Sequence, residues 1–307
     1  MSVWMFPGQG AQKVGMGSDL LVLPEVAETF ELAKEATGVD AVWLSKEGDE
    51  ADLNDALNSQ VLTSALSVGI ARALMARGAC PDVVVGFSLG QISALMVSGA
   101  LSLEEGFALL NERARALADA CKTHPGAMLA LLGASHEDAQ EICDLCAQGD
   151  VLVCANYNAP GQVVVSGTIE AIDRAESAWK EQSKRCARLR TAGAFHSPLM
   201  TGAAGKVSDF CAHLSFDHEN TVPIICNTDA RLFDMGQAAE RLANQVKSPV
   251  HFEQSIMALI EQGETEFVEV GFGGVLTGLV KRIDRGTDRL RIGTFAEWEN
   301  ELSKMVP

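Results

Sequence analysis

The sequence has few basic residues for its length. Its 307 residues contain 24 Lys and Arg against 41 Asp and Glu, which gives a formal net charge of -17 at pH 7. Because nucleic-acid binding depends on concentrated positive charge, this balance argues against a nucleic-acid partner. Two locally basic patches remain for an anionic partner, with solvated surface charge as the alternative interpretation of each. They are Lys184, Arg185, Arg188 and Arg190, and Lys281, Arg282, Arg285, Arg289 and Arg291.

Long apolar segments and secretion signals are also missing. Apolar runs such as 128–132 are far shorter than a bilayer span, and the first seven residues have neither a basic n-region nor a full h-region. We therefore expect no membrane contact and a cytoplasmic location. The eight cysteines fit reduced thiols better than a disulfide framework. Cys143 and Cys146 are the only close pair, and without further ligands nearby they do not predict a metal or redox site.

A glycine-rich loop follows an apolar strand at 3–6, but it lacks the signatures of a nucleotide-binding loop. Gly8 and Gly10 match the first two glycines of a dinucleotide fingerprint, whereas Lys13 stands where the third glycine belongs. No Gly-Lys-Ser or Gly-Lys-Thr follows, as a phosphate loop requires. Nucleotide binding is therefore disfavoured.

The most informative segment is the apolar run Val-Val-Val followed by Gly-Phe-Ser88-Leu-Gly90. Gly86 and Gly90 remove side chains that would block a sharp strand-to-helix reversal, and such a reversal exposes the Ser88 hydroxyl at the C-terminal edge of a sheet. The helix that starts there has free N–H groups, and that of Leu89 is the natural donor to an oxyanion. The pattern predicts an acyl-transfer nucleophile, with an ordinary glycine-flanked turn as the alternative.

A nucleophilic serine needs a base, and His196 is the histidine with the most suitable setting. It stands just before a helix start with Ser197 as cap and Pro198 at the first position, which can hold the ring rigidly toward a cleft. A surface-loop histidine is the alternative. The acid that α/β hydrolases place between Ser and His is poorly supported, because candidates such as Asp144 and Asp173 lie in a segment with a different pattern.

Arg113 is a cation on the apolar face of a predicted helix. It stands three or four residues from Leu109, Leu110 and Leu117, on the stripe that the helix buries. A cation in that position needs an anion. The two alternatives are a structural ion pair and a clamp for a substrate carboxylate.

The pattern along the chain is an α/β alternation interrupted once. Residues 1–123 and 192–307 predict a large, discontinuous α/β-hydrolase-like domain with a mostly parallel sheet. Residues 124–191 predict strand-helix-strand-strand-helix-strand, which is a ferredoxin-like unit small enough to be an insertion flanking the cleft. In the first part of the chain we expect helices at about 18–37, 59–77, 89–97 and 103–121.

Several segments in fixed order carry a family resemblance. They are Phe6-Pro-Gly-Gln9-Gly-Ala-Gln12, Gly-Phe-Ser88-Leu-Gly, Glu112-Arg113, Asn156-Tyr-Asn-Ala-Pro-Gly-Gln-Val-Val-Val-Ser-Gly, Phe195-His196-Ser, Asn227-Thr, Gln245-Val-Lys-Ser-Pro-Val and Glu269-Val-Gly-Phe-Gly-Gly-Val-Leu-Thr-Gly-Leu. Together they resemble the malonyl-CoA:acyl carrier protein transacylases of fatty-acid synthesis. The resemblance covers essentially the whole chain, and several motifs in order are far more specific than any one of them.

The resemblance implies a role for each site residue. Ser88 is the expected nucleophile, and His196 is the base that takes its proton and returns it to the departing coenzyme A thiol. The main-chain carbonyl of Gln245 orients the histidine in place of a carboxylate, which accounts for the missing acid. Gln9 and the N–H of Leu89 form the expected oxyanion hole.

The resemblance also implies the acyl specificity. Arg113 is expected to grip the free carboxylate of malonate, and Phe195 to exclude a branched methylmalonyl group. Two positions depart from the family, which usually has His where Phe87 stands and Glu where Gln91 stands. Neither position belongs to the catalytic scheme, so we expect activity to survive and place the effect of these departures on acyl preference and rate.

The function expected from the resemblance is malonyl transfer from malonyl-CoA to the phosphopantetheine thiol of acyl carrier protein through a malonyl-Ser88 intermediate, with no metal or redox cofactor. Carrier proteins of this pathway are usually acidic, so the basic patch formed by Lys184, Arg185, Arg188 and Arg190 is the expected contact at the domain cleft. The alternatives are a serine hydrolase or thioesterase, a trans-acting acyltransferase of a polyketide pathway, and a non-catalytic docking domain on the same fold.

Overall fold

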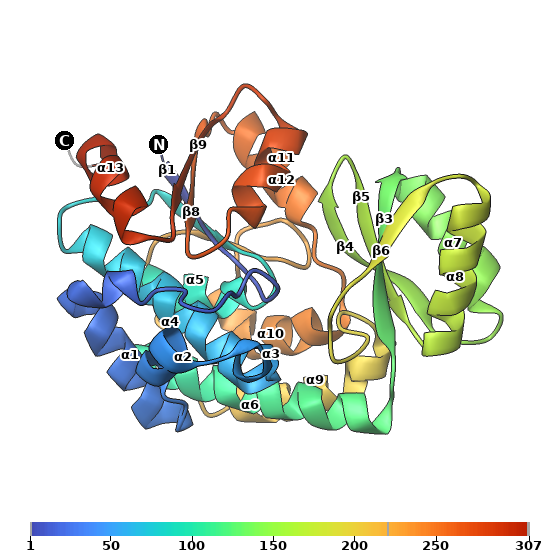
Figure 1. Cartoon of the computed structure of the whole chain (residues 1–307), viewed down its shortest axis with the longest axis horizontal. Helices are drawn as coiled ribbons and strands as arrows, with labels where there is room; N and C mark the ends of the chain where they lie inside the picture. The colour runs from blue at the N-terminus through green and yellow to red at the C-terminus, as the bar shows by residue number, and fades with distance from the viewer. Residues whose placement is uncertain (1, 220, 306–307) are drawn as a thin grey trace.

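The computed structural model describes residues 2–219 and 221–305 and contains two separate sheets (Figure 1). The first has five parallel strands in the order β7-β2-β1-β8-β9, so the first strand of the chain lies in its middle. The second has four antiparallel strands in the order β4-β5-β3-β6. These two sheets confirm the predicted α/β class with a mostly parallel sheet.

The parallel sheet and its helices come from both ends of the sequence. Its strands are β1 (Ser2–Phe6), β2 (Val83–Gly86), β7 (Ile224–Ile225), β8 (Glu266–Val270) and β9 (Asp288–Ile292). The helices before the second sheet are α1 (Pro24–Thr37), α2 (Ala41–Glu47), α3 (Glu50–Asn54), α4 (Ala56–Met75), α5 (Gly90–Ser98) and α6 (Leu103–Thr123). Those after it are α9 (Thr201–Cys211), α10 (Ala238–Lys247), α11 (Phe252–Glu261), α12 (Val275–Ile283) and α13 (Phe295–Met305). Short 3-10 helices are η1 (Asp19–Val22), η2 (Pro198–Met200) and η3 (Met235–Gln237).

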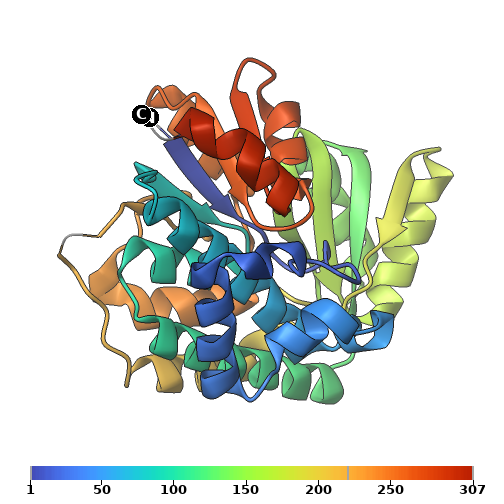
Figure 2. The same cartoon turned by 60° about the vertical axis from the view of Figure 1, so that its left-hand side comes forward.

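Helices cover both faces of the parallel sheet (Figures 1 and 2). Along β1, Trp4 and Phe6 face a core that includes residues of α1 and α4, whereas Val3 and Met5 face a second core that includes residues of α11 and α12. Burial on both faces explains why the central strands β1 and β2 have nearly continuous apolar sequences without alternation. The carboxyl ends of these strands meet at one edge, and β2 ends there directly before Ser88.

The second sheet has a core of its own. It is formed by β3 (Ala127–Ala134), α7 (His136–Ala147), β4 (Leu152–Ala159), β5 (Gly161–Gly167), α8 (Ile169–Glu181) and β6 (Arg185–Arg188). Leu129, Leu131 and Trp179 belong to the core between the sheet and its two helices. On the opposite face Met128 and Ala130 pack with Phe195, so this face of the sheet borders the chain segment that carries His196.

The structure differs from the predicted helices near the N-terminus. The single helix expected at 18–37 is divided into η1 and α1, because Leu23 is extended and Pro24 occupies the first helical position. Helix α4 begins at Ala56, three residues before the predicted start, because the Asp55 side chain accepts hydrogen bonds from the N–H groups of Leu57 and Asn58. Helices α2 and α3 were not predicted, although each starts after a capping aspartate.

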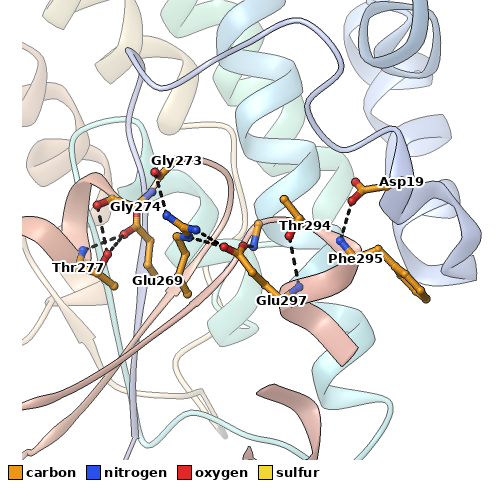
Figure 3. A network of polar contacts seen from close by, with 10 residues as sticks. Asp19, Glu269, Gly273, Gly274, Thr277, Thr294, Phe295 and Glu297 are labelled. Atoms are coloured by element: carbon orange, nitrogen blue, oxygen red, sulfur yellow. Dashed lines mark hydrogen bonds and ion pairs between the residues drawn. The ribbon is translucent and has the colours of Figure 1, made fainter. Parts of the chain in front are cut away.

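A buried carboxylate holds the loop between β8 and α12 (Figure 3). Glu269 has no exposed surface and accepts hydrogen bonds from the N–H of Gly274 at 3.2 Å and the N–H of Thr277 at 2.8 Å. Burial raises the pKa of Glu269, although these hydrogen bonds oppose the shift. A methyl group added at Gly271 would lie 2.7 Å from the Pro7 ring, so the loop packs tightly against the segment that leads to Gln9.

None of the helices within residues 2–219 and 221–305 is both long and apolar enough to cross a bilayer. The same residues contain no group of three or more His, Cys, Asp or Glu side chains placed to hold a metal ion.

Candidate active site

Ser88 lies on a sharp turn between β2 and α5, as the sequence predicted. Its backbone has a φ of 51°, a left-handed conformation that non-glycine residues rarely adopt and that recurs at functional sites. A methyl group at Gly86 would collide with the backbone of Gly90, and one at Gly90 would collide with the carbonyl of Phe6. Only glycine therefore fits at either position, and the turn presents the Ser88 side chain at the end of the sheet.

The Nε2 atom of His196 faces Ser88 and carries a free lone pair. Its Nε2 lies 2.8 Å from Ser88 Oγ, and its Nδ1 lies 2.9 Å from the main-chain oxygen of Gln245 and 3.1 Å from that of Ser248. Because carbonyl oxygens only accept, Nδ1 must carry the proton, and this leaves Nε2 free to accept from the serine. Burial, together with the charge of Arg113, lowers the pKa of His196 to about 4, so the imidazole is neutral at pH 7.

The two carbonyls that hold the imidazole belong to the C-terminal end of α10. The last carbonyls of a helix have no intrahelical partner and carry the negative end of its dipole. Ser88, in contrast, stands at the N-terminal end of α5. The site therefore lies between a helix end that favours a positive imidazole and one that favours a negative oxygen.

Side-chain amides fix the backbone of the turn by hydrogen bonds to Gly86 and Ser88. Asn227 Oδ1 accepts the N–H of Ser88 at 2.8 Å, and its Nδ2 donates to the carbonyl of Gly86. Gln245 Nε2 donates to the carbonyl of Ser88 at 2.8 Å, so this residue holds Ser88 with its side chain and His196 with its main chain. Gln91 Oε1 accepts from the N–H of Asn227 at 2.9 Å, which places this departure from the family behind the turn.

Arg113 lies beside the nucleophile. It is only 5% exposed, its NH2 group donates to Ser88 Oγ at 3.3 Å, and its NH1 group donates to Gln60 Oε1 at 2.9 Å. Its Nε has no hydrogen-bond partner, and it forms no ion pair with any residue that the structure describes. Burial lowers its pKa to about 10, so Arg113 is a buried cation at pH 7 with no protein anion beside it.

Gln9 and Leu89, the residues predicted to form an oxyanion hole, both lie near Ser88. The N–H of Leu89 belongs to the unpaired N-terminal groups of α5. The side-chain amide of Gln9 donates to Ser59 Oγ at 2.5 Å, which leaves its main-chain N–H as the available donor. The loop lies close to the turn, because a methyl group at Gly8 would lie 2.8 Å from the carbonyl oxygen of Phe87.

A cavity of about 100 Å³ opens in front of Ser88. The predicted acyl-pocket residue Phe195 lines it together with Phe87, and the ring of Phe87 contacts that of Phe252 edge-on with centroids 5.5 Å apart. Asn156 adds a buried polar wall. An adjoining groove of about 330 Å³ shares Gln9 and Phe195 with this cavity and extends to Arg190.

The four basic residues predicted to contact the carrier do not all share one face of the second sheet. Arg188 lies on the helix-covered face of the second sheet, where it pairs with Asp173 and Glu176 of α8. Lys184 pairs with Asp138 at 3.4 Å. Two further members lie toward the active site. Arg185 pairs in register with Leu132, on the same face as Ala130, and Arg190 lines the groove.

Several residues of the site carried no role in the sequence analysis. Ser248 contacts His196 through its main-chain carbonyl, and it stood in the recognised motif Gln245-Val-Lys-Ser-Pro-Val without an assigned contact. Asn227 stood in a recognised motif without an assigned contact. Gln60 lies inside a helix with no pattern to mark it.

The chain matches known acyltransferases over nearly its whole length. Residues 3–292 match the family model described as the acyl transferase domain. The chain is 37% identical to the malonyl CoA-acyl carrier protein transacylase of Bacillus subtilis (strain 168), over 99% of this chain and 95% of that protein.

Solved structures give the same result. The malonyl-CoA:acyl carrier protein transacylase from Xanthomonas oryzae pv. oryzae aligns with a TM-score of 0.95 and 37% identity, covering 100% of this chain and 98% of that one. A malonyl-transacylase in complex with its type II PKS acyl-carrier protein aligns with a TM-score of 0.94 and 31% identity, covering 99% of each chain.

Proposed function

This chain belongs to the acyl transferase family, among the malonyl-CoA:acyl carrier protein transacylases, and we propose that it transfers malonyl groups from malonyl-CoA to acyl carrier protein in fatty-acid synthesis. The observation that supports this function best is the contact between Arg113 and Ser88. A buried cation without a protein anion lies 3.3 Å from the nucleophile, which is where the carboxylate of a short acyl group would lie.

The first half-reaction acylates the serine. His196 Nε2 takes the proton of Ser88 Oγ as this oxygen attacks the thioester carbonyl of malonyl-CoA. The main-chain N–H groups of Leu89 and Gln9 stabilise the resulting oxyanion, and one such donor contributes about 3 to 4 kcal/mol to the transition state. The carbon–sulfur bond then breaks, and the imidazolium returns its proton to the leaving thiolate of coenzyme A.

The second half-reaction reverses these roles with a different thiol. His196 takes the proton of the phosphopantetheine thiol, and the sulfur attacks the malonyl-Ser88 ester. The ester bond breaks and Ser88 Oγ recovers the proton. Throughout, the carbonyls of Gln245 and Ser248 hold the ring and stabilise its positive charge.

Arg113 accounts for the preference for malonate. Its guanidinium offers charge-assisted hydrogen bonds to the free carboxylate, which an acetyl group lacks. Leaving a buried charge unpaired costs about 2 to 5 kcal/mol, which corresponds to roughly 30-fold to several-thousand-fold in binding. The apolar side chain of Phe195 lines the cavity in front of Ser88, where it leaves little room for a methyl branch.

Contact with the carrier protein is also part of the proposal. Carrier contact through the basic residues Lys184, Arg185, Arg188 and Arg190 remains our proposal, with Arg185 and Arg190 best placed for it.

Each step above moves protons between the serine, the histidine and a thiol, so the reaction needs no metal or redox cofactor. Eight free thiols fit a cytoplasmic location. We describe the large domain as α/β-hydrolase-like and the unit at 124–191 as ferredoxin-like, which its strand order supports.

Intact-mass spectrometry tests the proposal. Mixing the protein with malonyl-CoA should add one malonyl group, and adding the carrier with its phosphopantetheine thiol should move this group to the carrier. Ser88→Ala should form no adduct. A wild-type protein without a Ser88-dependent malonyl adduct would refute the function, and release of free malonate in place of transfer to the carrier would support a thioesterase.

A further inference from the structure

Every side chain in hydrogen-bond contact with the guanidinium of Arg113 is neutral. Gln60 Oε1 accepts from NH1 at 2.9 Å and Ser88 Oγ accepts from NH2 at 3.3 Å, and no described residue forms an ion pair with it. A buried cation normally has a carboxylate partner, because desolvation of an unpaired charge is costly. In this protein the side chain of Gln60, a neutral amide, occupies the position where such a carboxylate would be expected.

Gln60 is itself fixed and fully buried. It lies in α4 with no exposed surface, and its Nε2 group has no hydrogen-bond partner among the described residues. Its neighbour Ser59 accepts from the side chain of Gln9 at 2.5 Å. The first turns of α4 therefore contact both the loop that carries Gln9 and the arginine, and Arg113 is the donor to the Gln60 oxygen among the described residues.

We propose that Gln60 is a specificity-determining positioning residue, whose neutral amide holds Arg113 beside Ser88 without neutralising it, so that the acyl group must supply the carboxylate. This inference rests on the proposed malonyl transfer and deepens it. Selectivity then depends on two properties of this position. The side chain must accept a hydrogen bond, which aims the guanidinium, and it must carry no charge, which keeps the guanidinium available.

The effect of a negative charge at position 60 follows from the contact between Gln60 Oε1 and Arg113 NH1. A carboxylate in place of the Gln60 amide would put a negative oxygen at the same 2.9 Å from NH1. The two buried charges would pair with each other, because each relieves the desolvation cost of the other. An incoming malonyl carboxylate would then meet a neutralised arginine and a like charge, whereas an acetyl group would lose no interaction.

The test compares Gln60→Glu with the wild-type protein in Ser88 acylation by malonyl-CoA and by acetyl-CoA, measured as intact-mass adducts over time. We expect the ratio of malonyl to acetyl acylation rates to fall by about 30-fold or more. Gln162→Glu is the matched control, since Gln162 Oε1 accepts from Arg282 at 2.7 Å in the second sheet, away from the site. This control makes the same chemical change beside an arginine and should leave the ratio at the wild-type value.

Several outcomes would overturn the inference. One is a malonyl-to-acetyl ratio in Gln60→Glu that equals the ratio in Gln162→Glu. Another is an equal loss of acylation by both thioesters, since this would make Gln60 a general structural residue. If wild-type protein forms no malonyl adduct, the proposed function fails before Gln60 is tested, so the two failures are distinguishable.

A second variant covers the case in which Gln60→Glu does not fold. Gln60→Met keeps the volume and the neutrality but removes the acceptor oxygen. We expect the KM for malonyl-CoA to rise by about 10-fold, the loss of one hydrogen bond to a charged group, and more than the KM for acetyl-CoA. An equal change in both KM values would contradict the positioning role.

Discussion

The Nδ1–H of His196 donates to the main-chain carbonyl of Gln245 over 2.9 Å, at the C-terminal end of α10. In Ser-His-Asp sites a carboxylate at this position fixes the tautomer and stabilises the imidazolium. A helix end supplies a partial negative charge of about half an elementary charge. The carbonyl therefore fixes the tautomer by accepting the Nδ1–H, but a partial charge does less than a full carboxylate charge to raise the pKa of the histidine.

The first prediction concerns the pH dependence of Ser88 acylation. Because the pKa of His196 is lowered to about 4, the base stays unprotonated well below the pKa of about 6.5 of a free histidine. We expect kcat/KM for acylation by malonyl-CoA to be flat between pH 5 and 7. Stopped-flow measurement across this range is the check, and an acidic limb with a midpoint near 6.5 would contradict the shift.

The second prediction concerns stability. A histidine with a pKa of about 4 when folded and about 6.5 when unfolded binds its proton more readily in the unfolded chain. Stability is therefore lost as the pH falls from about 6.5 toward 4, and this residue alone removes about 2 kcal/mol between pH 7 and pH 5. His196→Gln should lose that part of the dependence in urea titrations at the two pH values. The same pH difference in variant and wild type would show that His196 does not cause it.

The turn at Ser88 was predictable because a known sequence pattern records both of its glycines. Gly86 is required by the backbone of Gly90 within the same turn, whereas Gly90 is required by the carbonyl of Phe6 on the neighbouring strand. The partners of Arg113 and His196 are not local. Gln60 and Ser248 are brought to the site by tertiary packing, and neither a mid-helix glutamine nor a main-chain carbonyl has a sequence signature.

Strand periodicity explains why the four basic residues are divided between two faces of the second sheet. Successive side chains of a strand point to opposite faces, so Arg185 and Arg188, three residues apart on β6, cannot share a face. Arg188 reaches the carboxylates of α8, and Arg185 faces the other way. The predicted patch grouped these residues by their proximity in the sequence and did not take the two-residue period of a strand into account.

The third prediction concerns Asn227. Its side chain joins the N–H of Ser88 to the carbonyl of Gly86 and is only 2% exposed. Asn227→Ala leaves both backbone groups without partners, so the strained φ of Ser88 loses its support. We expect the free energy of unfolding to fall by about 1 to 3 kcal/mol, and the rate of acylation to fall while the KM for malonyl-CoA changes little. Chemical denaturation and single-turnover kinetics measure the two effects. A raised KM with an unchanged rate would assign Asn227 to substrate binding instead.

The fourth prediction concerns Phe195. This half-buried ring lines the cavity before Ser88 and packs on Met128 and Ala130 of β3. Phe195→Ala removes the ring, so a methyl branch gains room beside the ester carbonyl. We expect the rate of Ser88 acylation by methylmalonyl-CoA to rise relative to that by malonyl-CoA, measured by intact mass. Phe210→Ala is a control, because Phe210 is a half-buried phenylalanine of α9 outside the cavity lining. A ratio that moves equally in both variants would exclude a specific role for Phe195.

The last prediction separates the two halves of the basic patch. Arg185 and Arg190 lie toward the active site, whereas Lys184 and Arg188 are paired with carboxylates. Reversing Arg185 and Arg190 to Glu should raise the KM for an acidic carrier by about 10-fold or more at low salt, since like charges then face each other. Reversing Lys184 and Arg188 should affect carrier transfer less, because their charge is already neutralised within the fold. Each rate is divided by the rate of acylation from malonyl-CoA, so that a general loss of activity cancels. If the Lys184 and Arg188 pair has the larger effect, the carrier binds over the helices of the second sheet and not at the cleft.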